Sequence, residues 1–180
     1  ARLRVFPCDY RATFVPASGG HPVYVRSPQR QAYRLQELAR WRAHLGVPLM
    51  IAPPHAPFDE SLAAGCVIAA RETIGDAPAV ALAHRVLRAL WEEGANPADT
   101  ATLAALIGDV GLDAPSLLAR GAEPRWAAMR AADSAAALAR GVFGAPSYVV
   151  GSEIFWGQDR LDFLARHLEK AGSGRGADQR

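Results

Sequence analysis

The sequence predicts an α/β fold, in which an α/β core is interrupted by an all-helical insertion. Three observations indicate this fold. Apolar and polar residues alternate over residues 2–8, which is typical of a short strand. Helices with recognisable ends fill residues 59–140. Two short strands and an amphipathic helix follow, so the helical block divides the strand-forming part of the chain into two segments.

Composition indicates a globular protein with a small-molecule partner. The 180 residues suit one domain, or one domain interrupted by a second. Twenty Lys and Arg residues against 18 Asp and Glu residues leave a formal charge of +2, which is too balanced to indicate a nucleic-acid partner. The sequence shows neither a long apolar run nor a basic-then-apolar leader, so we expect no membrane span and a cytoplasmic location.

The two cysteines do not indicate redox or metal chemistry. Cys8 and Cys66 are far apart, and the sequence has no C-x-x-C motif and no Cys/His pair at metal-ligand spacing. We therefore predict neither a dithiol centre nor a metal site.

The amino-terminal part of the chain contains one helix with clear signals. Residues 9–26 show little periodicity and include the turn segment SGGHP (Ser18–Pro22), so we expect a long loop there. Long loops in compact domains are often functional. A helix is predicted over 28–45. It would begin at the Ser27-Pro28 step, continue through apolar residues at helical spacing and end at Gly46.

The helical block is preceded by a connection that carries four prolines, Val47–Asp59. Because proline disrupts helices and central strands, we expect an extended segment there. Asp and Thr caps and Gly stops then divide the block into helices. These are expected at 59–75, 76–94, 99–110, a short stretch from residue 113, and 123–140.

A hairpin follows the block. Gly151 and Ser152 form a two-residue turn between the predicted strands Ser147–Val150 and Glu153–Trp156. An amphipathic helix is expected at Gln158–Lys170, and the Gly-rich tail after it is expected to be mobile.

The ends of this hairpin predict a binding site for a peptide-like molecule. Pro146 cannot donate to a strand ladder, so it indicates an edge at which the main chain of Ala145 can pair with an extended peptide. Gly157 and Gln158 open a helix whose free N–H groups favour a carboxylate, and Asp159 suits an ammonium group. Singly, each feature is an ordinary structural choice. Together they fit a molecule with an amide centre and a zwitterionic end, such as glutathione.

Two segments carry a resemblance to a known family. GVFGAPSYVVGSEIFWGQDRLDFL (residues 141–164) and RSPQRQAYRLQELARWRAHLGVPL (residues 26–49) resemble the 2-hydroxychromene-2-carboxylate isomerases, relatives of the kappa-class glutathione transferases. The resemblance runs over nearly the whole chain, and FGAP and FWGQDR are its specific motifs. It implies a homodimer and glutathione as cofactor. It also implies that Ala145, the cis-proline Pro146 and the Trp156–Asp159 step hold that cofactor.

The resemblance further implies a thioredoxin-like domain, formed by residues 1–50 and 141–172 around a helical insertion at 51–140, with a flexible tail at 173–180. The family begins with a strand, a turn with a catalytic serine, and a helix, and this unit would lie upstream of Ala1. Either the sequence is a piece of a longer product or the unit has been lost. No catalytic residue is therefore predicted within these residues.

The loop after residue 8 departs from the family pattern. In the family, a Lys and a later G-N step hold the carboxylate of the substrate. Here Phe14 falls near the Lys position and Gly19-Gly20 replaces G-N. The sequence therefore leaves the identity of the substrate acid open. Phe14, Arg26 and His55 are the predicted substrate contacts, Arg26 as a carboxylate clamp and His55 as a proton donor on a proline-stiffened loop.

Three alternatives remain open. The first is a kappa-class-like glutathione transferase, and the second is a binding member without turnover. The third, a thiol-disulfide oxidoreductase, lacks the C-x-x-C motif in these residues. The leading hypothesis is a glutathione-dependent isomerase that acts on an aromatic or unsaturated oxo-acid by reversible thiol addition.

Overall fold

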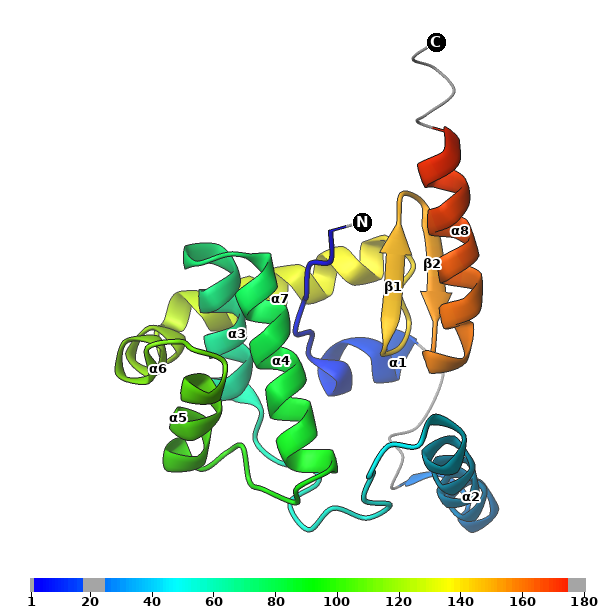
Figure 1. Cartoon of the computed structure of the whole chain (residues 1–180), viewed down its shortest axis with the longest axis horizontal. Helices are drawn as coiled ribbons and strands as arrows, with labels where there is room; N and C mark the ends of the chain where they lie inside the picture. The colour runs from blue at the N-terminus through cyan, green and yellow to red at the C-terminus, as the bar shows by residue number, and fades with distance from the viewer. Residues whose placement is uncertain (1, 18–24, 175–180) are drawn as a thin grey trace. The chain divides into compact units, whose positions relative to one another are not determined.

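The computed structural model describes residues 2–17 and 25–174. The chain divides into two compact units, which are drawn in Figure 1. Of the described residues, 9–17 and 134–174 form the first unit, and 2–8 and 25–133 form the second. No described helix is long and apolar enough to cross a membrane. The division into a thioredoxin-like domain and a helical insertion stays a prediction.

The second unit is a bundle of short helices. Helix α3 packs on α4 and α6, and α5 packs on the same two helices. Its core includes Cys66, Ile68, Leu82, Leu103 and Ile107, all fully buried. The helices are α3 (Ser61–Thr73), α4 (Asp76–Trp91), α5 (Thr100–Asp109), α6 (Ala114–Gly121) and the greater part of α7 (Pro124–Ala139). The predicted helical block is therefore confirmed.

Local capping explains where several helices begin. The carboxylate of Asp99 accepts a hydrogen bond from the Thr102 amide at 2.7 Å, and Asp113 accepts one from the Ser116 amide at 3.3 Å. Both aspartates thus satisfy an otherwise unpaired N–H of the first turn. The expected start near Asp59 is shifted to Ser61, although Asp59 still accepts from the amide of that residue at 3.0 Å.

Helix α2 (Pro28–Leu45) has the bounds that the sequence predicts. The hydroxyl of Ser27 accepts from the Arg30 amide, and Gly46 ends the helix in the left-handed region with a φ of 65°. No residue of α2 is buried. The proline-rich connection after it contains neither helix nor strand, as expected.

The prediction of a strand at residues 2–8 is wrong. Among the described residues the sheet contains only β1 and β2. Residues 2–8 instead bind side chains of the helical unit: Arg4 pairs with Glu72 at 2.7 Å, and the carbonyl of Val5 accepts from Arg71 at 3.1 Å. Because these partners are side chains rather than the main chain of a neighbouring strand, no β-ladder forms.

The first unit begins with a correction to the expected loop. Residues Tyr10–Phe14 form a π-helical turn, and Val15–Ala17 continue it as α1. The side chain of Asp9 accepts from the Ala12 amide at 2.9 Å, so Asp9 acts as a helix cap that the lack of periodicity concealed. The predicted turn Ser18–Pro22, with Gly19-Gly20, lies outside the described residues.

The hairpin of the first unit is confirmed. Strands β1 (Ser147–Val150) and β2 (Glu153–Trp156) are antiparallel, with Ser147 opposite Trp156. Arg140 donates to the carbonyl of Gly151 in the turn at 2.7 Å.

The last helix lies alongside β2 (Figure 1). A 3₁₀ turn (Gln158–Arg160) leads into α8 (Leu161–Gly174), which extends past the predicted end at Lys170. Of the predicted mobile tail 173–180, residues 175–180 lie outside the described residues.

Candidate functional site

The segment that enters β1 leaves the main-chain groups of one residue, Ala145, open. The Ala145–Pro146 bond is cis, and both residues are exposed. The carbonyl of Gly144 accepts from the Ser147 hydroxyl at 2.7 Å, and the carbonyl of Pro146 accepts from the Gly157 amide at 2.9 Å. Between these two bonds, no described residue is hydrogen-bonded to the main-chain N–H or C=O of Ala145. Within the described part of the chain, both groups are therefore available to a ligand.

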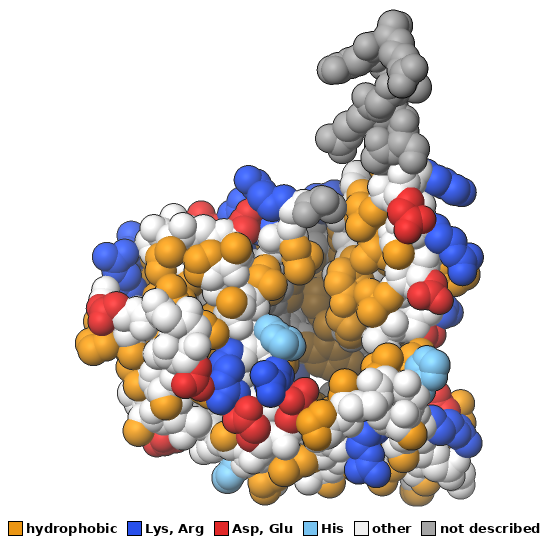
Figure 2. All heavy atoms as spheres, in the orientation of Figure 1, with side chains coloured by type: hydrophobic (Ala, Val, Ile, Leu, Met, Phe, Trp, Pro, Cys, Tyr) orange, Lys and Arg blue, Asp and Glu red, His pale blue; other side chains and the backbone are white. Residues whose placement is uncertain are grey.

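Two aromatic side chains lie at Gly144, the residue that precedes Ala145. The rings of Phe143 and Trp156 meet edge to face, with centroids 4.8 Å apart and an interplanar angle of 61°. The exposed fraction is 39% for Phe143 and 51% for Trp156. Hydrophobic side chains are visible at the surface over the hairpin and α8 in Figure 2. Exposed apolar surface of this kind often marks a binding site.

The start of the last helix lies at the other end of β2. Gly157 has a φ of 101°, in the region that favours glycine, and a Cβ there would lie 2.5 Å from a carboxylate oxygen of Asp159. Asp159 is ion-paired with the guanidinium of Arg160 at 2.7 Å, and both side chains are about half exposed. An incoming ammonium group therefore has to compete with Arg160 for this carboxylate.

The structure brings the predicted cofactor-binding residues together. They all belong to the first unit, and the Gly157–Pro146 hydrogen bond joins the two ends of the hairpin that carry them. The residues are Ala145, Pro146, Trp156, Gly157, Gln158 and Asp159, of which all but Gly157 are exposed. Their role in binding glutathione stays a prediction.

The predicted substrate contacts, unlike the predicted cofactor-binding residues, do not all belong to the first unit. Phe14 belongs to the first unit, but it is only 3% exposed and packs edge to face on Tyr10. Arg26, which is half-buried, and His55, which is exposed, belong to the second unit. All three assignments stay predictions.

Sequence reasoning missed three residues of the site. Arg160 directly follows Asp159, the residue predicted to bind an ammonium group. Its positive charge next to that carboxylate was the signal from which the ion pair could have been predicted. Phe143 and Gly144 belong to the FGAP motif, but their contacts with Trp156 depend on the register of the hairpin.

Neither cysteine has the environment of a reactive thiol pair. Cys66 is fully buried, and burial raises the pKa of its thiol to about 11. Its sulfur lies 3.6 Å from the carbonyl oxygen of Leu117. Cys8 is half-buried. Because the thiolate is the reactive form, Cys66 is a core residue and not a redox group.

Cys66 is expected to resist modification in the folded protein. In a Cys8→Ser variant at pH 8, a chromogenic disulfide reagent should release no more than about a tenth of an equivalent of product before denaturant is added, since only about one thiol in a thousand is ionised three pH units below its pKa. The same sample should react fully in denaturant. Fast labelling of the folded variant would contradict the burial.

The fold and these residues define a class of protein. Residues 7–169 match the DSBA-like thioredoxin domain family. The chain belongs to this family, and the predicted thioredoxin-like fold is confirmed.

Particular relatives within this class are isomerases. The chain is 37% identical over 134 residues to 2-hydroxychromene-2-carboxylate isomerase of Sphingobium xenophagum, covering 74% of this chain and 66% of the relative. It is 32% identical over 139 residues to the enzyme of the same name from Pseudomonas putida, covering 73% and 62%. The match spans less than two thirds of either relative. The resemblance stated from the sequence motifs is confirmed.

A solved structure shows the same fold. A 2-hydroxychromene-2-carboxylate isomerase aligns with a TM-score of 0.82 over 99% of this chain and 85% of its own, at 23% identity.

Proposed function

We propose that this chain is a glutathione-dependent isomerase of the 2-hydroxychromene-2-carboxylate isomerase type. The observation that carries the proposal is the open main chain of Ala145 in the same unit as the Gly157–Asp159 turn. The main chain of Ala145 suits an amide of the ligand, and the Gly157–Asp159 turn suits its zwitterionic end. The names of the two relatives support the isomerase class.

The residues present fit glutathione as a ligand. The N–H and C=O of Ala145 would pair with the main chain of its cysteine, as in the addition of a strand to a sheet edge. The carboxylate of Asp159 would release Arg160 and bind the ammonium group of the γ-glutamyl end in its place. The N–H groups at the start of the last helix would face its carboxylate.

The chemistry follows from what such a ligand supplies. Bound glutathione provides a thiol that can add reversibly to an unsaturated carbon of an oxo-acid and leave again, so that the former double bond is free to rotate and no redox change occurs. The role of this chain is to hold glutathione by the main chain of the tripeptide and by the charged γ-glutamyl end. Holding both parts fixes the direction in which the thiol points. We also propose a homodimer, as the family resemblance implies.

Asp159→Asn is expected to weaken glutathione binding about 10- to 100-fold, because a charged hydrogen bond is worth roughly 1.5–3 kcal/mol. Isothermal titration of the full chain measures the dissociation constant. Asp162→Asn is the matched control, since Asp162 is an exposed carboxylate on α8 in the following turn, and its affinity should stay within about twofold of the starting protein.

A truncated ligand separates the two elements of the site. The dipeptide Cys-Gly lacks the γ-glutamyl group, so its weaker binding should be insensitive to Asp159→Asn. If the substitution weakened both ligands equally, Asp159 would not contact the ammonium group. Absence of glutathione binding to the unsubstituted chain would refute the proposed cofactor.

Turnover distinguishes the enzyme from a binding protein. The absorbance of 2-hydroxychromene-2-carboxylate should change on addition of the chain together with glutathione, and not with either alone. Glutathione binding without any such change would refute 2-hydroxychromene-2-carboxylate as the substrate and favour the binding member.

A further inference from the structure

Gly144 lies against the indole of Trp156. A Cβ at residue 144 would stand 2.5 Å from the indole nitrogen and 3.1 Å from the neighbouring ring carbon Cε2. Non-bonded atoms do not approach as closely as 2.5 Å, so any other residue at this position displaces the indole or the main chain. Gly144 itself is buried, although Trp156 is half exposed.

The main chain at Gly144 has little freedom to move away. Its carbonyl accepts a hydrogen bond from the Ser147 hydroxyl at 2.7 Å. Two residues later, the carbonyl of Pro146 is held by the Gly157 amide at 2.9 Å, directly after Trp156 in the chain. A side chain at residue 144 would therefore be accommodated by rotation of the exposed indole rather than by the segment.

Phe143 restrains the indole as well. Its ring meets Trp156 edge to face with centroids 4.8 Å apart, a geometry that is favourable for aromatic pairs beyond the area that they bury. The first two residues of the FGAP motif thus act together on one side chain: Gly144 leaves space for the indole, and Phe143 contacts its ring.

We infer that Gly144 and Phe143 are positioning residues that hold the indole of Trp156 as a wall beside the open main chain of Ala145. The inference rests on the proposed function. The inference goes beyond the proposed function because it assigns Phe143 and Gly144, the first half of FGAP, to the orientation of the Trp156 indole. The ligand contacts are assigned to the residues that follow them. Trp156 then covers a peptide-like ligand that Ala145 holds by hydrogen bonds.

The orientation is measured first without any ligand. Gly144→Ala should shift the emission of Trp156 and change its quenching by acrylamide, with the Trp156→Phe variant used to subtract the other three tryptophans. Gly108→Ala is the matched control, because a Cβ at Gly108 meets nothing within 4 Å. An unchanged Trp156 signal in Gly144→Ala would overturn the positioning role, whatever the protein binds.

Ligand binding is measured second. Gly144→Ala should raise the glutathione dissociation constant at least about tenfold, whereas Gly108→Ala should leave it unchanged. Phe143→Leu should raise it about three- to tenfold, as loss of an aromatic pair predicts, and Phe143→Tyr should restore it. The thermal midpoints of these variants show whether the hairpin is still folded.

The outcomes separate this inference from the proposed function. If the unsubstituted chain does not bind glutathione, the proposed function fails and the emission data still decide the orientation of Trp156. If glutathione binds and Gly144→Ala binds equally well, the wall is overturned and the proposed function stands.

Discussion

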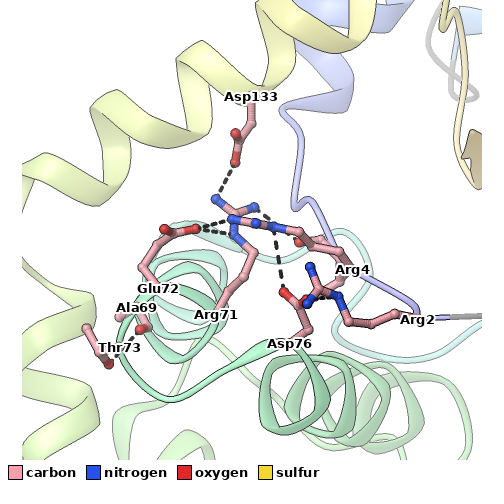
Figure 3. Close-up of polar contacts among 9 residues, drawn as sticks. Arg2, Arg4, Ala69, Arg71, Glu72, Thr73, Asp76 and Asp133 are labelled. Carbon is pink, nitrogen blue, oxygen red and sulfur yellow. Dashed lines mark hydrogen bonds and ion pairs between the residues drawn. The ribbon is translucent and has the colours of Figure 1, made fainter. Parts of the chain in front are cut away.

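Replacing Arg71 with Met is expected to lower the free energy of unfolding by about 3–5 kcal/mol, the range for removing one partner of a buried ion pair. Its side chain is 1% exposed, and its guanidinium binds two carboxylates, Glu72 at 2.7 Å and Asp133 at 2.8 Å (Figure 3). It also donates to the carbonyl of Val5 at 3.1 Å and stacks on the ring of Phe6 at 4.6 Å. Met fills a similar volume but removes this cation from Asp133 and Glu72 and this donor from the Val5 carbonyl, so that Arg4 is the cation that stays on Glu72.

Urea unfolding followed by circular dichroism measures the effect. Arg88→Met is the matched control, because Arg88 pairs with Glu92 on the exposed surface of α4 at 2.9 Å. Exposed pairs of this kind contribute about 0.3–0.5 kcal/mol. We call Arg71 and its partners Glu72, Asp133 and Val5 the Arg71 cluster. If Arg71→Met lowered the free energy of unfolding by less than about 1 kcal/mol, this cluster would contribute no more than a surface ion pair.

The pH dependence provides a second measure of the same contacts. A hydrogen bond from Arg71, with the charges of Arg71 and Arg4, holds the pKa of Glu72 below its ordinary value of 4.5. Its folded pKa therefore lies below its unfolded pKa, so this contribution is present above about pH 4.5 and is lost as the pH falls through the folded value. We expect Arg71→Met to lose less stability than the starting protein over this acidic range.

The Arg71 cluster also explains why part of the fold could not be predicted from the sequence. Helix bounds were predictable because their signals are local: Ser27, Asp99 and Asp113 bind amides within their own first turn. The contacts of residues 2–8 involve side chains more than sixty residues away, such as Arg71 with Val5. Alternation alone indicates an extended segment, and it does not say whether its partner is a strand or a helix.

The candidate site shows the same limit. Ala145 and Asp159 could be proposed from the sequence because a proline before a strand and an Asp at a helix start have local meanings. The contact of Gly144 with Trp156 spans the hairpin, and it became visible only once the register placed Ser147 opposite Trp156. The ion pair of Asp159 with Arg160 was adjacent in sequence, but its rotamers were not predictable.

Gly65→Ala is expected to destabilise the protein by about 3 kcal/mol or more, at or above the upper end of the usual range for overpacking. Helices α3 and α6 approach each other at Gly65 and Gly121, and a Cβ on Gly65 would lie well under 3.0 Å from the carbonyl oxygen of Gly121. A side-chain neighbour could rotate away, but this neighbour is main chain of a helix. The two helices would therefore have to separate, which would open the core around Cys66.

The same comparison of unfolding curves tests this prediction, with Gly108→Ala as the control. A Cβ at Gly108 meets no atom within 4 Å, so Ala there should be neutral or should stabilise α5 by up to about 1 kcal/mol through its higher helix propensity. The two substitutions add the same methyl group to a helix, and the difference between them therefore reports the space between α3 and α6. If Gly65→Ala unfolded at the same urea concentration as Gly108→Ala, the close approach of these helices would not exist in solution. Failure of Gly65→Ala to fold at all, with Gly108→Ala folded, would agree with it.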